Sequence, residues 1–364
     1  MSTPAGNLAA LRRRIFEQLG DVTRPMPGRI LAKLAALLLM GIGAEALYLL
    51  CEGWAERGLA VLMGTLSTIG IGTGIHTASH GAVFESDRKN RVLTWIGYPL
   101  AISLSATMWW HRHCKLHHSN PNVVDADSDI DFAPVLAFKQ EDVEGRSLPW
   151  RAWVKVQWLA LPFLLAFNGL SQIRQGWAWI LSSIWDRQER RAEHFIDLGL
   201  MSLHWVIWGV VPALFFPWQD VALFLLLRNV GAGYAMFGVL APGHLPGVTP
   251  LLSSELQRAE WMIRQTLTTV NFSTGWLGRL LCSGLEFQIE HHLMPSIPDP
   301  VYRRIAPIVR EFCEEHGYPY RSFSWTNALF QSWLAFKNIR PTETDLGRAL
   351  AEATEAMGPQ MITE

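Results

Sequence analysis

Histidines gather at three places in the chain, at spacings that suit metal binding. The three groups are HTASH, HRHCKLHH and QIEHH, and they hold His76 and His80, then His111, His113, His117 and His118, then His291 and His292. Residues four apart lie on one face of a helix, so two rings can bind the same ion. Neutral imidazole is a common metal ligand. The spacing therefore predicts a metal centre.

The number of histidines indicates two ions rather than one. His113 and His117 share a helical face, and His118 lies about 100° further round, where it can serve a second ion. His244, in APGHLP, is a further candidate ligand. One ion takes about four to six ligands, fewer than these imidazoles supply. Ligation by nitrogen alone suits iron, zinc or copper, and spacing does not choose among them.

Several neighbouring residues are candidates for orienting the ligands. Metal-bound histidines usually donate their second ring N–H to a carboxylate or a carbonyl. Asp127 and Asp129, in DADSDID, are candidate acceptors, although a solvated loop is an equal alternative. Gln288 stands one turn before the last histidine pair, and His111 is more plausibly supporting than ligating.

The remaining histidines have a simpler interpretation. We interpret His194, His204 and His316 as ordinary hydrogen-bonded polar residues. Of these, His204 lies within an apolar stretch, where a polar group is costly and therefore often functional.

Composition places these histidines in a membrane protein. Apolar residues make up 49% of the 364 residues and charged residues 17%, against about 25% charged in soluble domains. The 17 tryptophans suit membrane–water boundaries. A net charge of -1 argues against nucleic acid as a partner. The four cysteines form no C-x-x-C pair, which fits a reduced compartment, and no cleavable signal is apparent.

Four apolar stretches are long enough to cross a bilayer. They run over residues 30–50, 58–75, 198–217 and 221–240. Short connections, CEGWAERG and PWQD, join them in pairs, which predicts two helical hairpins. Arginines are concentrated before the first stretch, whereas the two connections hold only Arg57. The positive-inside rule then predicts that both termini and the histidines are cytoplasmic.

We predict an all-α integral membrane protein with four transmembrane helices as two hairpins, interfacial helices and a cytoplasmic histidine-rich cap. A fifth apolar region, residues 153–170, contains Pro162 and has basic flanks, which suits a helix lying in the interface. Residues 1–29 are expected to form a cytoplasmic N-terminal segment, 30–340 one membrane-embedded domain, and 341–364 a polar tail.

The motifs resemble the membrane-bound fatty acid desaturase superfamily. Four segments between about Ile75 and Trp325 are similar to conserved segments of that family. They are HTASHGAVF followed by Asn90, SATMWWHRHCKLHHSNPN with DADSDI, WMIRQTLTTVNFS, and GLEFQIEHHLMPSIP. QIEHHLMP is the most specific and resembles the linoleoyl-CoA and front-end branch. Two departures are Gln288 and Cys114. Many relatives have histidine in place of Gln288, so the resemblance implies a weak ligand or a supporting group there, and this branch often has asparagine in place of Cys114.

This resemblance implies a di-iron centre and a chemistry. The ligands it implies are His76, His80, His113, His117, His118, His291 and His292, with His244 as the extra histidine after the last span. Iron and O2 would remove two hydrogens from an acyl chain and leave a cis double bond and water. The acyl carrier, whether CoA, acyl carrier protein or a lipid, is open. The His-Pro-Gly-Gly haem motif of fused front-end enzymes is absent from this sequence, so we expect electrons from a separate ferredoxin or cytochrome b5 and its reductase.

A long apolar slot between the spans is expected to hold the acyl chain. Trp109 and Trp110 are candidates for its wall, although interfacial anchoring is the better interpretation of both. Arg112 and Lys115 are candidates for binding an anionic head group, unless they simply face water or lipid phosphate.

Other functions remain open from sequence alone. The nearest are other oxidations at the same centre: hydroxylation, acetylenic bond formation, or decarboxylation to a terminal alkene. A membrane carrier or receptor that binds haem or zinc is less favoured, because the histidines gather at one edge of the spans. A zinc hydrolase is similarly remote. A bacterial inner membrane is the expected location, with an endoplasmic reticulum origin as the alternative.

Overall fold

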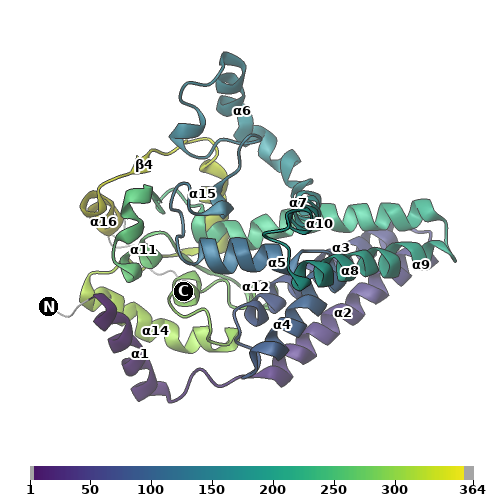
Figure 1. Ribbon diagram of the computed structural model, residues 1–364, viewed down its shortest axis with the longest axis horizontal. Helices are drawn as coiled ribbons and strands as arrows, with labels where there is room; N and C mark the ends of the chain where they lie inside the picture. The colour runs from purple at the N-terminus through teal and green to yellow at the C-terminus, as the bar shows by residue number, and fades with distance from the viewer. Residues whose placement is uncertain (1–3, 356–364) are drawn as a thin grey trace.

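Four long helices form the membrane part of the protein. The computed structural model describes residues 4–355. Within that part, four segments are long and apolar enough to cross a bilayer: α2 (Pro27–Leu50), α3 (Trp54–Ser79), the α8–α9 segment (Ala192–Ala213) and α10 (Trp218–His244). They extend to one side of the molecule, and α3 packs against both α2 and α10 (Figure 1). The prediction of a largely helical membrane protein with four candidate spans is confirmed.

The ends of two spans differ from those predicted. The third begins at Ala192 rather than residue 198 and consists of α8 (Ala192–Trp205), a π-helical turn η5 (Val206–Val210) and α9 (Val211–Ala213). The fourth runs on through His244, which closes α10 instead of following it. Hydropathy falls before helical hydrogen bonding ends, so an apolar window marks the lipid-facing length and not the helix end.

Polar residues inside the spans face one another. Glu45 on α2, His204 on α8 and Arg228 on α10 are all buried. His204 Nδ1 lies 2.9 Å from the Leu100 carbonyl, and Arg228 Nη2 lies 3.5 Å from His204 Nε2. Glu45 and Arg228 attract each other by their opposite charges. These groups are thus shielded from lipid by packing between helices.

Short helices between α3 and α6 carry the histidines of the motif HRHCKLHH. They are α4 (Asp87–Trp95), the π-helical η1 (Ile96–Ala101), α5 (Ala106–Trp109), the π-helical η2 (Trp110–His117), and the 3-10 turns η3 (Ser128–Ile130) and η4 (Gln140–Asp142). Asp197 of α8 fixes the start of α5. Its Oδ2 accepts hydrogen bonds from Ser105 Oγ (2.7 Å), Thr107 N (2.9 Å) and Thr107 Oγ1 (2.6 Å). The segment that carries the histidines is therefore tied to the third span.

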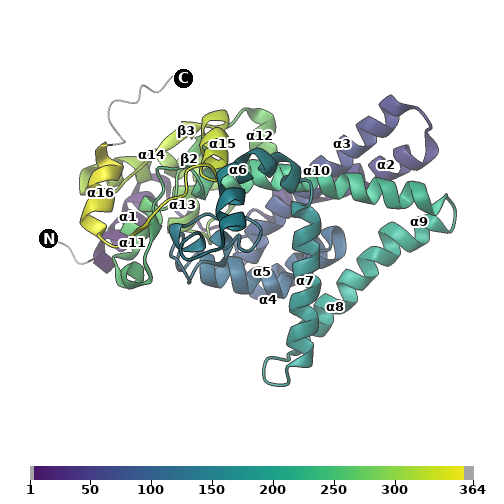
Figure 2. The same ribbon diagram turned by 90° about the horizontal axis from the view of Figure 1, so that it is seen from above.

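Two helices form the region predicted to lie in the interface. α6 (Leu148–Leu165) and α7 (Asn168–Trp185) meet at an angle of 81°. In Figure 2, α7 runs across the direction of α10. The crossing is close, because a Cβ on Gly169 would lie 2.5 Å from the Asn229 carbonyl oxygen of α10. Glycine permits this approach, which fixes where α7 sits.

The C-terminal part packs around the histidine end of the spans. Its elements are η6 (Ser254–Arg258), α11 (Trp261–Leu267), α12 (Trp276–Cys282), α13 (Gln288–Leu293), α14 (Asp299–His316), α15 (Trp325–Leu334) and α16 (Leu346–Glu355), with strands β1 (Leu251–Leu252), β2 (Asn271–Ser273), β3 (Ser322–Ser324) and β4 (Thr342–Glu343). The strands pair in parallel, β1 with β4 and β2 with β3.

The two ends of the chain are packed against this C-terminal part. α1 (Pro4–Leu19) buries Leu11 and Ile15 against α14. The expected polar tail is partly built into the fold, since β4 pairs with β1 and α16 buries Ala349 and Ala353. One apolar face of an amphipathic helix is enough for such docking. Residues 356–364 of that tail lie outside the described residues.

Removal of the Asp197 carboxylate tests the link between the third span and the segment that carries the motif HRHCKLHH. We expect Asp197→Ala to lower the apparent melting temperature of the purified protein, because each buried donor left without a partner costs about 1–3 kcal/mol. Asp186→Ala, which removes an exposed carboxylate bonded only to Gln188 N, is the matched control. Equal melting temperatures for the two variants would contradict the role given to Asp197.

Candidate metal centre

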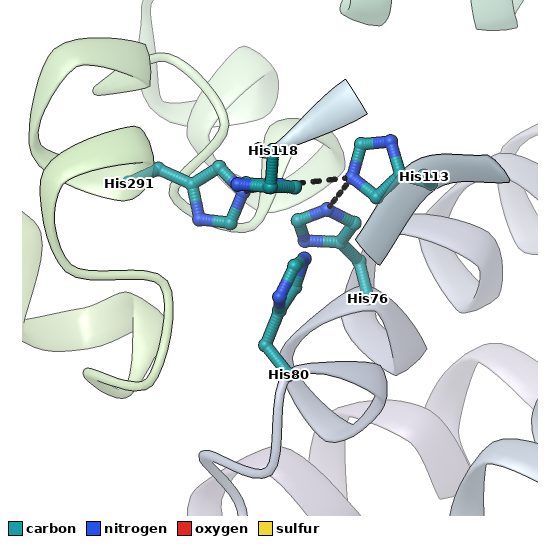
Figure 3. A group of neighbouring side chains, drawn as sticks. All are labelled: His76, His80, His113, His118 and His291. Carbon is teal, nitrogen blue, oxygen red and sulfur yellow. Dashed lines mark hydrogen bonds between the residues drawn. The ribbon is translucent and has the colours of Figure 1, made fainter. Parts of the chain in front are cut away.

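Five histidines from three parts of the chain converge at the end of α3. The ring nitrogens of His76, His80, His113, His118 and His291 lie within 4.8 Å of one another (Figure 3). His76 Nε2 is 2.8 Å from His113 Nε2, and His118 Nε2 is 3.2 Å from the same atom. His291 Nε2 is 3.1 Å from His118 Nε2. We call these five residues the first group.

Three further histidines form a second group beside the first. His117, His244 and His292 also offer ring nitrogens within 4.8 Å of one another. The groups touch, since the rings of His118 and His292 are stacked with centroids 4.3 Å apart. Gln288 lines the same cavity as His117 and His244. All eight histidines predicted as ligands are thus gathered in two neighbouring groups, with Gln288 at the edge of the second.

The π-helical turn η2 distributes its histidines between the groups. His118 N donates to the His113 carbonyl at 3.1 Å, a bond over five residues that widens the turn. His113 and His117 then stack with centroids 5.1 Å apart. His113 and His118 belong to the first group and His117 to the second. Such turns are frequent at functional sites, and here one turn serves both groups.

Two aspartates hold rings of η2 from behind, at the positions predicted. Asp127 Oδ2 lies 2.9 Å from His117 Nδ1, and Asp129 Oδ2 lies 3.3 Å from His113 Nδ1. Asp127 is buried, and it also accepts hydrogen bonds from Asn122 N and Asp129 N. A carboxylate at Nδ1 keeps the proton there and leaves Nε2 free as a ligand.

Two residues that sequence reasoning did not single out act in the same way. His292 Nδ1 lies 2.9 Å from Gln265 Oε1, and Gln265 Nε2 donates to the His118 carbonyl at 3.1 Å. His291 Nδ1 lies 3.2 Å from the Tyr302 hydroxyl, which donates to the Met294 carbonyl. Gln265 lies within the motif WMIRQTLTTVNFS, so the motif marked the segment but not the residue.

A buried polar cluster supports the last histidine pair. Glu290 accepts hydrogen bonds from Asn271 Nδ2 at 2.8 Å and from the Tyr320 hydroxyl at 2.7 Å. Asn271 Oδ1 accepts a hydrogen bond from the backbone N–H of Ile289, the residue before Glu290. Burial raises the pKa of Glu290 to about 7, and the two donated bonds oppose that rise. Burial and Glu290 together also raise the pKa of Tyr320. This cluster fixes the start of α13.

Asn90 has a similar role beside the first histidine pair. Its side chain accepts hydrogen bonds from Val83 N and Phe84 N and donates to the carbonyls of Gly81 and Phe84. These four bonds close the turn that follows His80.

Some predicted residues lie elsewhere. His111 packs against Trp179 at 4.8 Å between centroids and joins neither group, and its expected role in orienting ligands stays a prediction. His111 lies in the π-helical turn η2, on a different face from the candidate ligands of that turn. His194, His204 and His316 likewise belong to no group among residues 4–355.

The remaining residues of the second motif have separate surroundings. Trp109 stacks on His113 at 4.2 Å between centroids, whereas Trp110 packs on Trp95. Cys114 Sγ lies 4.0 Å from His80 Nε2. Lys115 is exposed.

A cavity of about 570 Å³ reaches both histidine groups. His113, His117 and His244 line it together with Gln288, and leucine and phenylalanine side chains form much of the rest. This volume lies in the range of about 300–1,000 Å³ usual for ligand sites. An apolar chain in this cavity would lie directly against the two groups.

The ring nitrogens have the chemistry of a metal site. His292 Nε2 and the Nδ1 atoms of His118 and His244 are buried without a hydrogen-bond partner. Buried polar atoms normally have one, and short distances between ring nitrogens require a proton or a cation between them. Metal ions bound by imidazole nitrogen satisfy both conditions. The residues present therefore fit a metal centre.

The fold and this site define a helical membrane protein with a histidine-rich metal-binding centre. The sequence model of the family Fatty acid desaturase matches residues 52–324, most of the chain. The chain belongs to the fatty acid desaturase family.

Individual relatives agree with this assignment. The chain is similar to the Delta(5) fatty acid desaturase of Caenorhabditis elegans, with 27% identity over 80% of this chain and 65% of that protein. It is also similar to the acyl-lipid (8-3)-desaturase of Rebecca salina (26% identity; 84% and 69%) and the acyl-lipid (7-3)-desaturase of Diacronema lutheri (30%; 83% and 67%). The chain thus spans about two thirds of the length of these relatives, between 65% and 69%.

Substitution of Asp127 tests whether the second group binds metal through an oriented His117. We expect Asp127→Asn to weaken metal binding about 10- to 100-fold, because the amide can hold the wrong tautomer of the ring. Metal content after dialysis against graded chelator measures this affinity. Asp125→Asn, in the same loop but with its side chain 81% exposed, is the control. Identical chelator curves for the two variants would contradict the proposed role of Asp127.

Proposed function

We propose that this protein is an O2-dependent fatty acyl desaturase that uses two iron ions to introduce a cis double bond. The observation that carries the proposal is the meeting of two histidine groups with an apolar cavity in a chain of this family. The first group would hold one iron and His117, His244 and His292 the other. The iron pair supplies the oxidising power, taken from O2, that no side chain has.

The protein's own residues orient the ligands and position the substrate. Asp127, Asp129, Gln265 and Tyr302 keep the Nδ1 sides of four rings occupied, so that their Nε2 atoms face inward. The cavity excludes water and holds an extended chain against that face. In this proposal no side chain of the protein acts as a nucleophile, because the protein's role is to position the substrate.

The carrier of the acyl chain is proposed from the relatives. Two of them are named acyl-lipid desaturases, which favours a lipid-linked chain over one on CoA or acyl carrier protein. Electrons would come from a ferredoxin or cytochrome b5 with its reductase. The names of the relatives give no support to hydroxylation, acetylene formation or decarboxylation.

The arrangement in the membrane is also part of the proposal. The short connections between the spans favour two helical hairpins. The arginines before α2 favour an orientation in which both termini and the histidine groups lie on the cytoplasmic side. The three relatives named above are eukaryotic and lend no support to a bacterial inner membrane, which stays a prediction from sequence.

Product analysis tests the proposed reaction. We expect cells that express the protein to accumulate a new unsaturated fatty acid, detected as its methyl ester by mass spectrometry. The doubly substituted variant His291→Ala, His292→Ala should lose the product and its bound iron. His316→Ala is the matched control, because His316 stacks on Phe312 outside both groups.

The product also separates the alternatives. Hydroxylated, acetylenic or terminal-alkene products would replace desaturation by a related oxidation. No change in lipids from a folded, iron-loaded protein with a compatible donor would exclude acyl substrates.

A further inference from the structure

The cavity has two kinds of wall. Leu161, Leu164 and Phe237 are among the apolar side chains that line it from α6 and α10. α7 lines it with polar side chains instead, among them Ser171, Gln172 and Arg174. A cavity divided in this way fits a ligand that joins an apolar chain to a polar head.

Two arginines border the cavity, and only one of them has partners. Arg112, the residue expected from sequence to bind a head group, donates to Gln175 Oε1 at 2.5 Å and to the Ser128 carbonyl at 2.9 Å. It therefore joins η2 to α7. Arg174 is exposed and makes no hydrogen bond or ion pair within residues 4–355. The unpaired guanidinium on the cavity wall is thus that of Arg174.

The cavity opens beside apolar side chains. Phe167 lines it and is 63% exposed, as is Val135 at 54%. Phe163, on the last turn of α6, is 76% exposed. Large apolar side chains around an opening suit contact with lipid.

We propose that Arg174 binds a phosphate group of the acyl substrate and so sets which part of the chain reaches the histidine groups. This inference rests on the proposed function. An acyl chain esterified to a carrier has no carboxylate, so the anion near it is a phosphate, of a lipid or of CoA. Arginine binds phosphate through two parallel N–H donors, and the neighbouring Ser171 and Gln172 offer neutral ones.

One charge nearby opposes this role. Asp131 also lines the cavity and is exposed, with no partner among the described residues. Its carboxylate repels a phosphate, so its removal and the removal of Arg174 have opposite expected effects. Asp129 and Arg112, the other charged residues of the wall, are already bonded to protein groups.

Equilibrium binding to the purified full-length protein tests the proposal without turnover, since no electron donor is added. Three labelled probes share one acyl chain: oleoyl lysophosphatidate, oleoyl-CoA and monooleoylglycerol, which has no phosphate. We expect Arg174→Gln to weaken binding of at least one of the two phosphate-bearing probes about 10-fold and to leave binding of monooleoylglycerol unchanged. Arg174→Lys should retain part of the affinity, and Asp131→Asn should bind at least as tightly as the unsubstituted protein.

The remaining variants and probes decide the source and the specificity. A loss confined to lysophosphatidate indicates a membrane lipid, and a loss confined to oleoyl-CoA indicates the thioester. Arg151→Gln removes an exposed charge from α6 away from the cavity wall and should change nothing. If Arg174→Gln bound both phosphate-bearing probes as tightly as the unsubstituted protein does, or if Arg151→Gln lost as much affinity as Arg174→Gln, the proposal would be overturned. Because binding is measured apart from product, a missing unsaturated acid would sink the proposed function without deciding the role of Arg174.

Discussion

The close approach of eight imidazole rings is the constraint on which the rest of the structure depends. Five ring nitrogens lie within 4.8 Å of one another in the first group, with no carboxylate among them. Protonated rings at such distances repel strongly, and neutral ones leave lone pairs facing each other. The arrangement is favourable only with a shared cation, so the protein must hold these rings in place until one binds. Much of the surrounding structure has that effect.

Four of the eight rings, those of His113, His117, His291 and His292, are held from the side away from their neighbours. Asp127 and Tyr302 are buried and come from different segments, yet both contact an Nδ1 atom and leave Nε2 directed inward. The segments are themselves fixed: Asp197 ties the start of α5 to the third span, and Glu290 with Asn271 ties α13 to β2. The spans thus determine the ring positions through a few buried polar contacts, which are expensive to lose singly.

The sequence predicted the spans and seven of the eight histidines because both depend on local spacing, whereas His244 stands alone in APGHLP and was favoured by the family resemblance. A run of apolar residues implies a helix across the bilayer, and residues four apart imply a shared face. Gln265 and Tyr302 could not be found in this way, since only tertiary packing brings them to His292 and His291. The position of His111 outside both groups has a related cause. A π-helical turn changes which neighbours share a face, and nothing in HRHCKLHH distinguishes such a turn from an α-helix.

The division between histidines and cavity walls explains why the motifs identify a family but not a product. In the proposed function, the histidine groups would contact the substrate only where it passes them, and their spacing is the same wherever along the acyl chain that point falls. The walls, from Leu161 and Phe237 to the polar face of α7, would then decide how far an acyl chain enters and which carbon lies opposite His117 and His244. These residues belong to α6, α7 and α10, outside every histidine motif. Substitutions there can therefore shift the reacting carbon while the metal-binding geometry stays intact, so regiochemistry follows from the cavity.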